Sequence, residues 1–358
     1  MLSEPEAVSL AVCKSFVGTL SIIGSGMLVW HSIRSLWLRQ KPAYHRLLTG
    51  MSLMDIFHSF FGCTLTNTLV LPKSGAWGAH GNRATCRLSG VAKQFSVAVP
   101  IYNFSLSLYF LHVIRNGKKE VELWFEGLLH FMPWSFGTVA SIYGLAKDFF
   151  YPMRIPEVGC WNQEFPLGCD NDKASINPEV PACQGGFSGP ASVRVAVINM
   201  AFWPLVASIV GVLIANLVIF SSVYSSQRRL SVYAHSSTTS ASNNQTKQVA
   251  MQNLVYVLVM VHTNFWILML DIAAYIGSLP ENMVYPIFLL YTLTFPSQGF
   301  FNFFVYIRGR YLGFRRIFGF SRWESFCKSA FPSDDVLTGR HVAQHALVVR
   351  GAKKRNST

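Results

Sequence analysis

Seven apolar stretches of bilayer length constrain the fold of this chain more than any other feature. A helix that crosses a membrane needs about 20 mostly apolar residues, and such stretches lie at residues 9–31, 47–71, 84–114, 126–146, 193–223, 249–276 and 284–307. The last one ends abruptly in Arg308 and Arg310, the polar exit expected where a helix leaves lipid. The composition agrees, since 51% of the residues are hydrophobic and 13% are charged. We therefore predict an all-α membrane protein, a bundle of seven transmembrane helices.

The uneven distribution of lysine and arginine predicts the orientation of this bundle. Cytoplasmic connections carry an excess of both residues. Here the excess falls on residues 34–46, 115–122 and 224–248 and on the segment after residue 307, whereas residues 147–192 are rich in acidic side chains. The amino terminus is therefore expected outside the cell and the carboxyl terminus inside.

This orientation divides the chain into three parts. Residues 1–8 would form an extracellular terminus, residues 9–320 the membrane domain, and residues 321–358 a disordered cytoplasmic tail. The net charge of +13 then lies mostly on the cytoplasmic side. It suits attraction to anionic membrane lipid better than binding to nucleic acid, because no soluble domain is left to present a groove.

The cysteines give an independent indication of the same orientation. Cys86, Cys160, Cys169 and Cys183 all fall on the predicted outer side, where oxidising conditions allow disulfides. A bridge between Cys86, at the start of the third stretch, and Cys160 would hold the following outer loop over the mouth of the bundle. A bridge between Cys169 and Cys183 would close a short loop. The sequence leaves three pairings open.

Several motifs recur in an order known from one receptor family. They are a cysteine at the head of the third stretch, the pair Cys160-Trp161 in the next outer loop, EGLLHFMPW at the start of the fourth stretch and PSQGFFNFFVY in the seventh. Together they resemble the cyclic-AMP-receptor-like family of G-protein-coupled receptors, which shares features with the secretin and adhesion receptors. The resemblance covers all seven stretches and neither terminus. It implies a plasma-membrane receptor that binds an extracellular ligand and signals to a heterotrimeric G protein.

The chain departs from the rhodopsin-like pattern at three places. The third stretch ends in LYFLHVIRNGKK, with no acidic residue before its arginine, and the sixth contains no proline. In the seventh, Asn302 and Tyr306 keep the spacing of the NPxxY motif, but Phe303 replaces the proline. Residues 284–307 also contain no lysine, so they lack the Schiff-base residue that a retinal photoreceptor needs.

Lys93 is an ionisable residue inside an apolar stretch, where a charge is costly and indicates function. It lies about two helical turns after Cys86, in the outer half of the third stretch. The resemblance implies that this level lines the ligand cavity, and a buried ammonium there suits an anionic ligand such as a phosphate or carboxylate. Asp271, near the outer end of the sixth stretch, is its candidate counter-ion. A salt bridge without a ligand, or a side chain that reaches the outer surface, is the structural alternative.

Asp55 and Asn302 lie in the inner halves of the second and seventh stretches. If these helices adjoin, as they do in such receptors, the two side chains could share a polar network with Tyr306, together with water or a sodium ion. Activation could switch this network between two arrangements. A static hydrogen bond between the helices is the alternative.

The inner face is where a G protein would bind. The arginines expected to face it are Arg115, Arg228, Arg229, Arg308 and Arg310. We expect residues 224–248 to form a polar loop. Ser231 in this loop follows RRL, which resembles the target of a basophilic kinase, and phosphorylation of Ser231 would switch signalling off. A flexible linker without this regulation is the alternative. Residues 307–318 combine aromatic and basic side chains at helical spacing, which predicts an amphipathic eighth helix on the membrane surface.

Other functional classes fit the sequence less well. An orphan seven-helix transporter is the main alternative, although the two halves of the chain show no matched pair of broken helices. We find no cluster of catalytic groups that would indicate an enzyme. The histidines in the apolar stretches are single residues without the spacing of a metal site, and no cofactor is expected.

Overall fold

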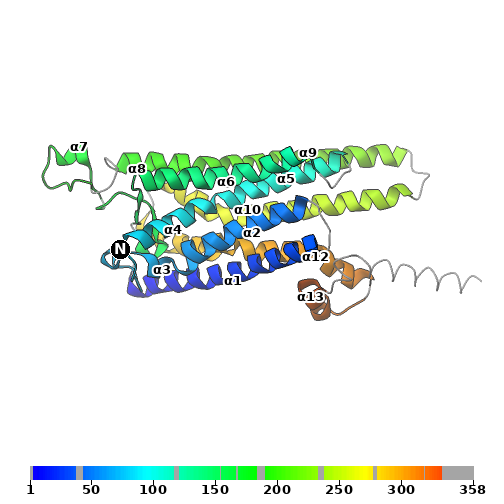
Figure 1. Ribbon diagram of the computed structural model, residues 1–358, viewed down its shortest axis with the longest axis horizontal. Helices are drawn as coiled ribbons and strands as arrows, with labels where there is room; N and C mark the ends of the chain where they lie inside the picture. Colours follow the sequence, from blue (N-terminus) through cyan, green and yellow to red (C-terminus); the bar gives the residue numbers. More distant parts are fainter. Residues whose placement is uncertain are drawn as a thin grey trace, which may run out of the picture.

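The computed structural model describes residues 3–37, 43–116, 121–153, 155–166, 168–183, 190–232, 238–276, 280–317 and 319–332. These residues are mostly helical and form an elongated bundle (Figure 1). The helices of the bundle are α1 (Glu4–Trp37), α2 (Ala43–Phe57), α3 (Thr66–Leu69), α4 (Arg83–Ser96), α5 (Ala98–Asn116), α6 (Leu123–Ala146), α8 (Pro190–Val197), α9 (Trp203–Val232), α10 (Thr238–Ile276), α11 (Glu281–Thr294) and α12 (Gln298–Ile317).

Each of the seven apolar stretches is largely helical, and three of them contain a change of helix type. The π-helical segments η1 (His58–Thr64) and η4 (Ile198–Phe202) interrupt the second and fifth stretches, and the 3₁₀ turn η5 (Phe295–Ser297) interrupts the seventh at Pro296. Proline removes a backbone donor, which explains the last of these. Within the described residues, four helical segments are long and apolar enough to cross a membrane: Glu4–Ser35, Arg83–Asn116, Val195–Ser225 and Ala250–Ala273.

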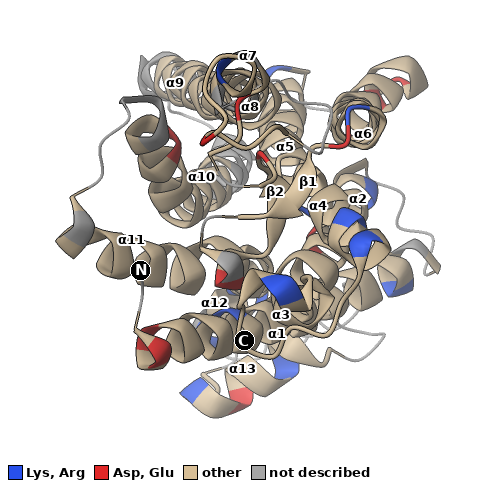
Figure 2. Ribbon diagram, turned by 90° about the vertical axis from the view of Figure 1, so that its left-hand side faces the viewer, with Lys and Arg blue, Asp and Glu red and all other residues tan. Residues whose placement is uncertain are grey.

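The two ends of the bundle differ in structure. One end, which we call the disulfide end, carries the Cys86–Cys160 bridge and the antiparallel hairpin of β1 (Phe150–Pro152) and β2 (Cys160–Asn162). It lies at the left of Figure 1 and faces the viewer in Figure 2, where the hairpin crosses the middle of the bundle beside α4. The helix α7 (Asn171–Ala174) and the 3₁₀ turns η2 (Pro72–Ser74) and η3 (Pro156–Val158) belong to the same end. The opposite end carries α13 (Arg322–Ala330).

The largest hydrophobic core joins most helices of the bundle. Its fully buried members include Leu28 of α1, Leu47 and Met51 of α2, Tyr102 of α5 and Ile219 of α9. Burial of a large apolar side chain contributes about 1.5–3 kcal/mol in water. In lipid the surroundings are as apolar as the core, so close packing and hydrogen bonds between helices carry more of the stability.

Two glycines bring α1 and α12 into backbone contact. A Cβ atom at Gly24 would lie 2.7 Å from the carbonyl oxygen of Gly299, and one at Gly299 would lie 2.2 Å from Ser25 Oγ. Small residues at such positions are how membrane helices approach closely. The approach lets the backbone N–H of Gly299 donate to Ser21 Oγ at 2.9 Å.

The predicted eighth helix differs from the observed one. Instead of a separate helix over residues 307–318, α12 continues without a break to Ile317. The turn comes at Gly319, whose φ of 67° favours glycine. The short helix α13 follows, and Ser321 caps it by accepting a hydrogen bond from Glu324 N at 3.2 Å. Residues 322–330, which we expected in a disordered tail, are therefore helical, while residues 333–358 lie outside the described part.

Contacts with α1 hold α13 in place. His31 Nε2 lies 2.9 Å from the carbonyl oxygen of Ala330, and Arg34 Nη1 donates to that of Pro332 at 2.9 Å. These carbonyls lie at the end of the short helix and just beyond it, where intrahelical partners are lacking.

The polar loop expected over residues 224–248 is also mostly helical. Helix α9 extends to Val232 and α10 begins at Thr238. No glycine or proline occurs from Val212 to Ile276. Serine, threonine and asparagine are only weak helix breakers, so helices that begin in the apolar stretches propagate through this polar segment from both sides.

Candidate functional site

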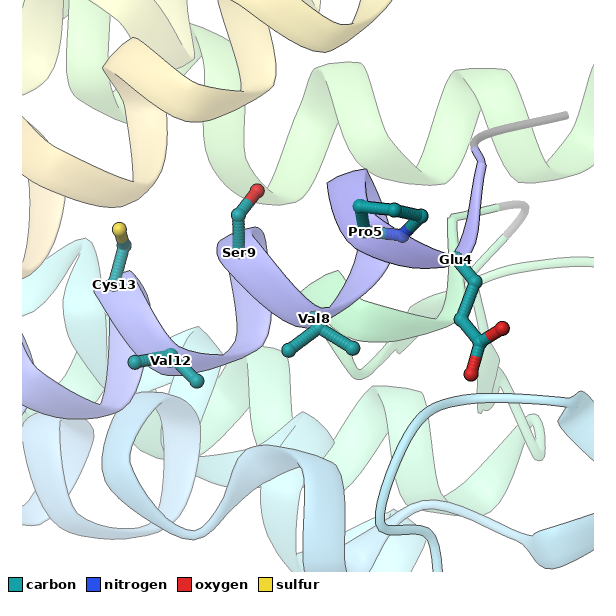
Figure 3. A pocket seen from close by; sticks show the side chains of 6 residues that line it. All are labelled: Glu4, Pro5, Val8, Ser9, Val12 and Cys13. Carbon is teal, nitrogen blue, oxygen red and sulfur yellow. The ribbon is translucent and has the colours of Figure 1, made fainter.

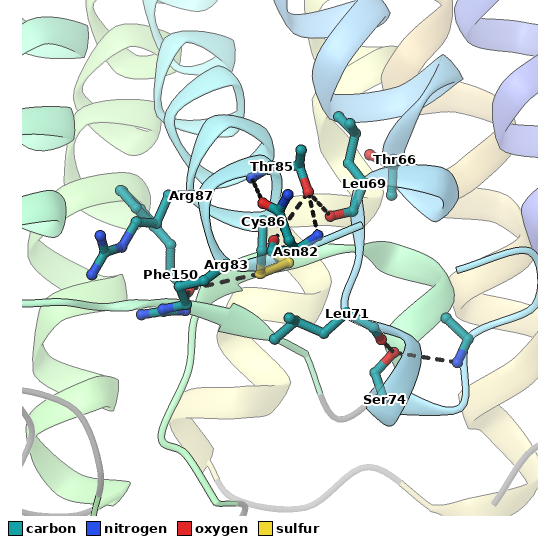
Figure 4. The surroundings of a disulfide bond; sticks show 12 residues. Thr66, Leu69, Leu71, Ser74, Asn82, Arg83, Thr85, Cys86, Arg87 and Phe150 are labelled. Carbon is teal, nitrogen blue, oxygen red and sulfur yellow. Dashed lines mark hydrogen bonds between the residues drawn. A yellow bond between two sulfur atoms is a disulfide. The ribbon is translucent and has the colours of Figure 1, made fainter. Parts of the chain in front are cut away.

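The loop between α6 and α8 covers the disulfide end and is anchored mainly on α4. The Cys86–Cys160 disulfide joins β2 to α4 (Figure 4), and Gln94 Nε2 donates to Asn162 Oδ1 at 3.2 Å. The ring of Phe150 fills a notch between two glycines, since a Cβ at either Gly90 or Gly144 would lie 2.4 Å from it. This hairpin is therefore a packed lid and not a loose connection.

An ion cluster at Asp148 strengthens the anchor. Arg83 and Arg87 both contact the carboxylate, Arg87 Nη2 at 2.8 Å, and Tyr151 donates to it at 2.8 Å. Burial would raise the pKa of Asp148, but the hydrogen bonds from Arg87 and Tyr151 and the charge of Arg83 outweigh it and hold this pKa below its ordinary value of 3.8. Asp148 is thus ionised at neutral pH.

Beneath this lid, two buried lysines converge on one backbone carbonyl. Lys14 of α1 is 1% exposed and Lys93 of α4 is 3% exposed. Lys14 Nζ donates to the carbonyl oxygen of Val158 at 2.5 Å, and Lys93 Nζ donates to the same oxygen. Val158 ends the short turn η3 of the covering loop. The two lysine side chains, far apart in sequence, therefore share one acceptor.

The surroundings of this lysine pair come from the second helix and the lid. Lys93 Nζ lies 5.9 Å from the centroid of the Trp161 ring, within cation–π range. The π-helical segment η1 supplies His58, whose Nδ1 lies 3.3 Å from the carbonyl oxygen of Ala92, and Cys63, whose Sγ lies 3.4 Å from His58 Nε2. Single π-helical turns inside α-helices occur frequently at functional sites.

An open groove lies next to α1 but does not contain the lysine pair. It has a volume of about 620 Å³ and is lined by the first turns of α1 (Figure 3): Glu4, Pro5, Val8, Ser9, Val12 and Cys13. Ser9 at its edge shares a hydrogen bond of 2.9 Å with Tyr285 of α11. The groove is mostly apolar and offers little polar chemistry.

The structure does not bring Lys93 and Asp271 together. The two side chains form no ion pair, and Asp271 Oδ2 has no hydrogen-bond partner among the described residues. The partner of Lys93 is the Val158 carbonyl, which arrives from a loop that folds back into the bundle. Asp271 was inferred as the counter-ion from its depth in the predicted membrane, and depth does not indicate that a loop carbonyl will reach Lys93.

The predicted inner network is divided into separate contacts. Asp55 Oδ2 accepts hydrogen bonds from Ser21 at 2.9 Å and Ser25 at 2.8 Å, so its partners lie on α1. Asn302 Nδ2 contacts Met51 Sδ at 3.9 Å, and its Oδ1 has no described partner. Tyr306 accepts from Arg310 at 2.6 Å. The three residues thus lie in the predicted helices without a direct hydrogen bond joining them.

The arginines expected at the inner face are found near the end opposite the lid. Arg115 at the end of α5 is exposed, and Arg308 and Arg310 on α12 are half-buried. One guanidinium nitrogen of Arg310, Nη1, is buried and has no described partner. Arg228, Arg229 and Ser231 lie in the last turns of α9, and their side chains are outside the described part.

Sequence reasoning missed two buried charges. Lys14 interrupts the first apolar stretch just as Lys93 interrupts the third, so the cost of a charge in lipid would have identified it. Glu126 of α6 forms a two-point ion pair with Arg46 of α2, with Nη2 to Oε2 at 2.5 Å. Glu126 is the first residue of the predicted stretch 126–146, and a charged residue at the end of a membrane helix does not by itself indicate a buried ion pair.

Comparison with solved structures identifies the fold. It is similar to that of squid rhodopsin, a G-protein-coupled receptor. The similarity has a TM-score of 0.60 and covers 93% of this chain and 94% of the squid protein, at 13% sequence identity. No protein-family model and no curated protein sequence matches the chain. The likeness therefore shows the helical fold of squid rhodopsin, and the cyclic-AMP-receptor-like assignment stays a prediction.

Proposed function

We propose that this protein is a G-protein-coupled receptor with seven membrane crossings and an extracellular amino terminus. An extracellular ligand binds beneath the lid at the disulfide end, and a heterotrimeric G protein binds at the opposite end. The ligand acts by favouring the conformation in which the inner end opens. The plasma membrane is the location that suits this role.

The observation that carries the proposal is the similarity of fold along nearly the whole of both chains. A match restricted to a few helices would fit any helical membrane protein. Two further features support the orientation. Both disulfides within the described residues lie at the lid, on the side expected to be oxidising, and exposed or half-buried arginines such as Arg34, Arg115 and Arg308 lie toward the other end.

The contacts between α1, α2 and α12 support a switch between two arrangements. Asp55 is held by two serines of α1, and the backbone of Gly299 is hydrogen-bonded to one of them. Rotation of α12 would break the Gly299 contact and bring Asn302, whose Oδ1 has no described partner, toward a new donor. Tyr306 and Arg310 would move with the same helix.

A signalling assay tests the proposal directly. Cells that express the full chain with a panel of G-protein α subunits are exposed to a library of anionic metabolites, and cyclic nucleotide and calcium levels are read. We expect one ligand to produce a response that requires a specific α subunit, that falls in the Lys93→Ala variant and that is altered in Asn302→Ala. Antibody access to terminal tags on intact cells should find only the amino-terminal tag.

Two outcomes would contradict the proposal. The first is an externally accessible carboxyl-terminal tag, which would reverse the orientation. The second is uptake of a library anion into proteoliposomes that contain the purified protein, with no activation of any G protein, since that combination identifies a transporter.

A further inference from the structure

The lysine pair has more hydrogen-bonding capacity than its present acceptor can satisfy. An ammonium group has three donors, and the Val158 carbonyl oxygen is the one acceptor that the described residues offer to either Lys14 or Lys93. A carbonyl oxygen has two lone pairs, which these two donors occupy. Several N–H groups are therefore left without an acceptor among the described residues.

The charge of the pair is also incompletely balanced. Within the described part of the chain, neither Lys14 nor Lys93 forms an ion pair with a carboxylate, although Glu157, which is 5% exposed, lies in the same short turn as Val158. Two ammonium groups that share one acceptor would in addition repel one another. Buried charges are costly unless they are paired and fully hydrogen-bonded. A ligand with several anionic oxygens would supply both the missing charge and the missing acceptors.

We propose that Lys14 and Lys93 form a binding site for a phosphate group, and that the Val158 carbonyl occupies this site until phosphate displaces it. The inference rests on the proposed function only in placing the ligand at the disulfide end. A phosphate offers more acceptor oxygens and more charge than a carboxylate, which suits two converging ammonium groups. Inorganic phosphate and a phosphate monoester share this chemistry.

The geometry of the lid makes such a displacement feasible. Val158 lies between β1 and β2, and the strands themselves are held by the Cys86 disulfide and by the Phe150 notch. Gly159, with a φ of 100°, forms the bend that aims the carbonyl at the lysines. The turn itself is held by backbone hydrogen bonds, from Val158 N to Ile155 O at 3.1 Å and from Met153 N to Gly159 O at 3.0 Å, so displacement would move it as a unit while the hairpin stays attached. Ligand binding would then change the shape of the lid.

Thermal unfolding of the purified full chain in detergent tests the site. Unfolding temperatures are measured in sodium phosphate, in glycerol 3-phosphate and in sodium chloride of matched ionic strength. We expect saturable stabilisation by a phosphate compound beyond that by chloride. Loss of one charged hydrogen-bond donor should weaken phosphate binding by roughly tenfold or more in Lys14→Gln and in Lys93→Gln. The exposed Lys73→Gln serves as the matched control and should bind like wild type.

Two glycines of the lid test the displacement step. A Cβ at Gly159 would lie 2.4 Å from Thr66 Cγ2 and 3.0 Å from Lys93 Nζ, so Gly159→Ala should push the turn away from the lysines and raise phosphate affinity several-fold. Gly168, in the same loop, also has a positive φ of 78° but nothing within 4 Å. Gly168→Ala therefore controls for backbone strain and should leave affinity unchanged.

Three results would overturn the inference. They are equal stabilisation of wild type by phosphate compounds and chloride, equal phosphate binding in wild type and both lysine variants, and unchanged or weaker binding in Gly159→Ala. A wild-type protein that is stabilised equally by all salts would refute the site even if the variants failed to fold. These measurements contain no G protein, so phosphate binding without signalling would refute the proposed function and leave this inference standing. The relative affinities of the two phosphate compounds distinguish a free ion from an ester as the ligand.

Discussion

Replacing Gly24 by alanine should separate α1 from α12. The new Cβ would lie 2.7 Å from Gly299 O and from Phe300 Cα, against 3.4 Å for ordinary contact, a shortfall of 0.7 Å. These are backbone atoms, which cannot turn aside as a side chain can. A gap of about 0.5–1 Å forfeits a quarter to a half of the dispersion energy of the atoms that line it, and overpacking typically costs about 1–3 kcal/mol.

Gly26→Ala is the matched control for this change. Gly26 lies two residues away on the same helix, and a Cβ atom added there would have nothing within 4 Å. Alanine has a higher helix propensity than glycine by about 1 kcal/mol, and this gain is common to both variants. The difference between them therefore isolates the contact with α12, which also includes the hydrogen bond from Gly299 N to Ser21 Oγ.

Thermal unfolding in detergent, followed by circular dichroism, measures the difference. A loss of 1 kcal/mol lowers the unfolding temperature by about 2–4 °C for a chain of 150–250 residues, so Gly24→Ala should unfold several degrees below Gly26→Ala. Gly299→Ala, whose Cβ would lie 2.2 Å from Asp55 Oδ2, should behave like Gly24→Ala. Equal unfolding temperatures for the two α1 variants would refute the close approach of the helices.

Three further changes test other contacts. Cys86→Ser should lower stability by about 2–5 kcal/mol and make the lid sensitive to protease, because its bridge to Cys160 closes a long loop; full protease resistance would argue against the anchor. The stabilisation that Asp148 gives the hairpin should be present above the ordinary pKa of 3.8 and be lost as the pH falls through the lowered pKa of the folded state. Hydrogen exchange should therefore show that the hairpin amides lose protection in acid in the wild type and not in Asp148→Asn. Arg46→Gln should destabilise more than the double variant that also carries Glu126→Gln, because the single change leaves the buried Glu126 carboxylate with His130, at 4.0 Å, in place of the two-point contact with Arg46; additive effects of the two substitutions on the free energy of unfolding would exclude the ion pair.

The helices of this protein were largely predictable because their signal is local. Apolar stretches such as 9–31 and 249–276 carry their hydropathy within the stretch itself, and the helical residues coincide with it. The predictions failed where an element's extent depended on its neighbours. Residues 238–248 are polar, yet they are helical as the first turns of α10, and the eighth helix began after Gly319 and not at residue 307.

The candidate site was predictable only in part. Lys93 could be recognised as a charge in an apolar stretch, but its partner could not, because a lysine contains no information about which distant carbonyl will reach it. Val158 is 65 residues away in the chain, and Lys14 is 79 residues from Lys93 on the other side. The same limit applies to Asp55, whose serine partners on α1 lie 34 and 30 residues away in the chain.

Sequence alone determined that this chain forms apolar helices and that four cysteines fall on one predicted side of them, since both properties follow from residue type and spacing. Tertiary structure decided which side chains meet. It paired Cys86 with Cys160, folded the lid into the bundle and placed Lys14 beside Lys93 on the Val158 carbonyl. The physical reason is that hydropathy acts locally along the chain, whereas a hydrogen bond depends on atoms that only packing brings within about 3 Å.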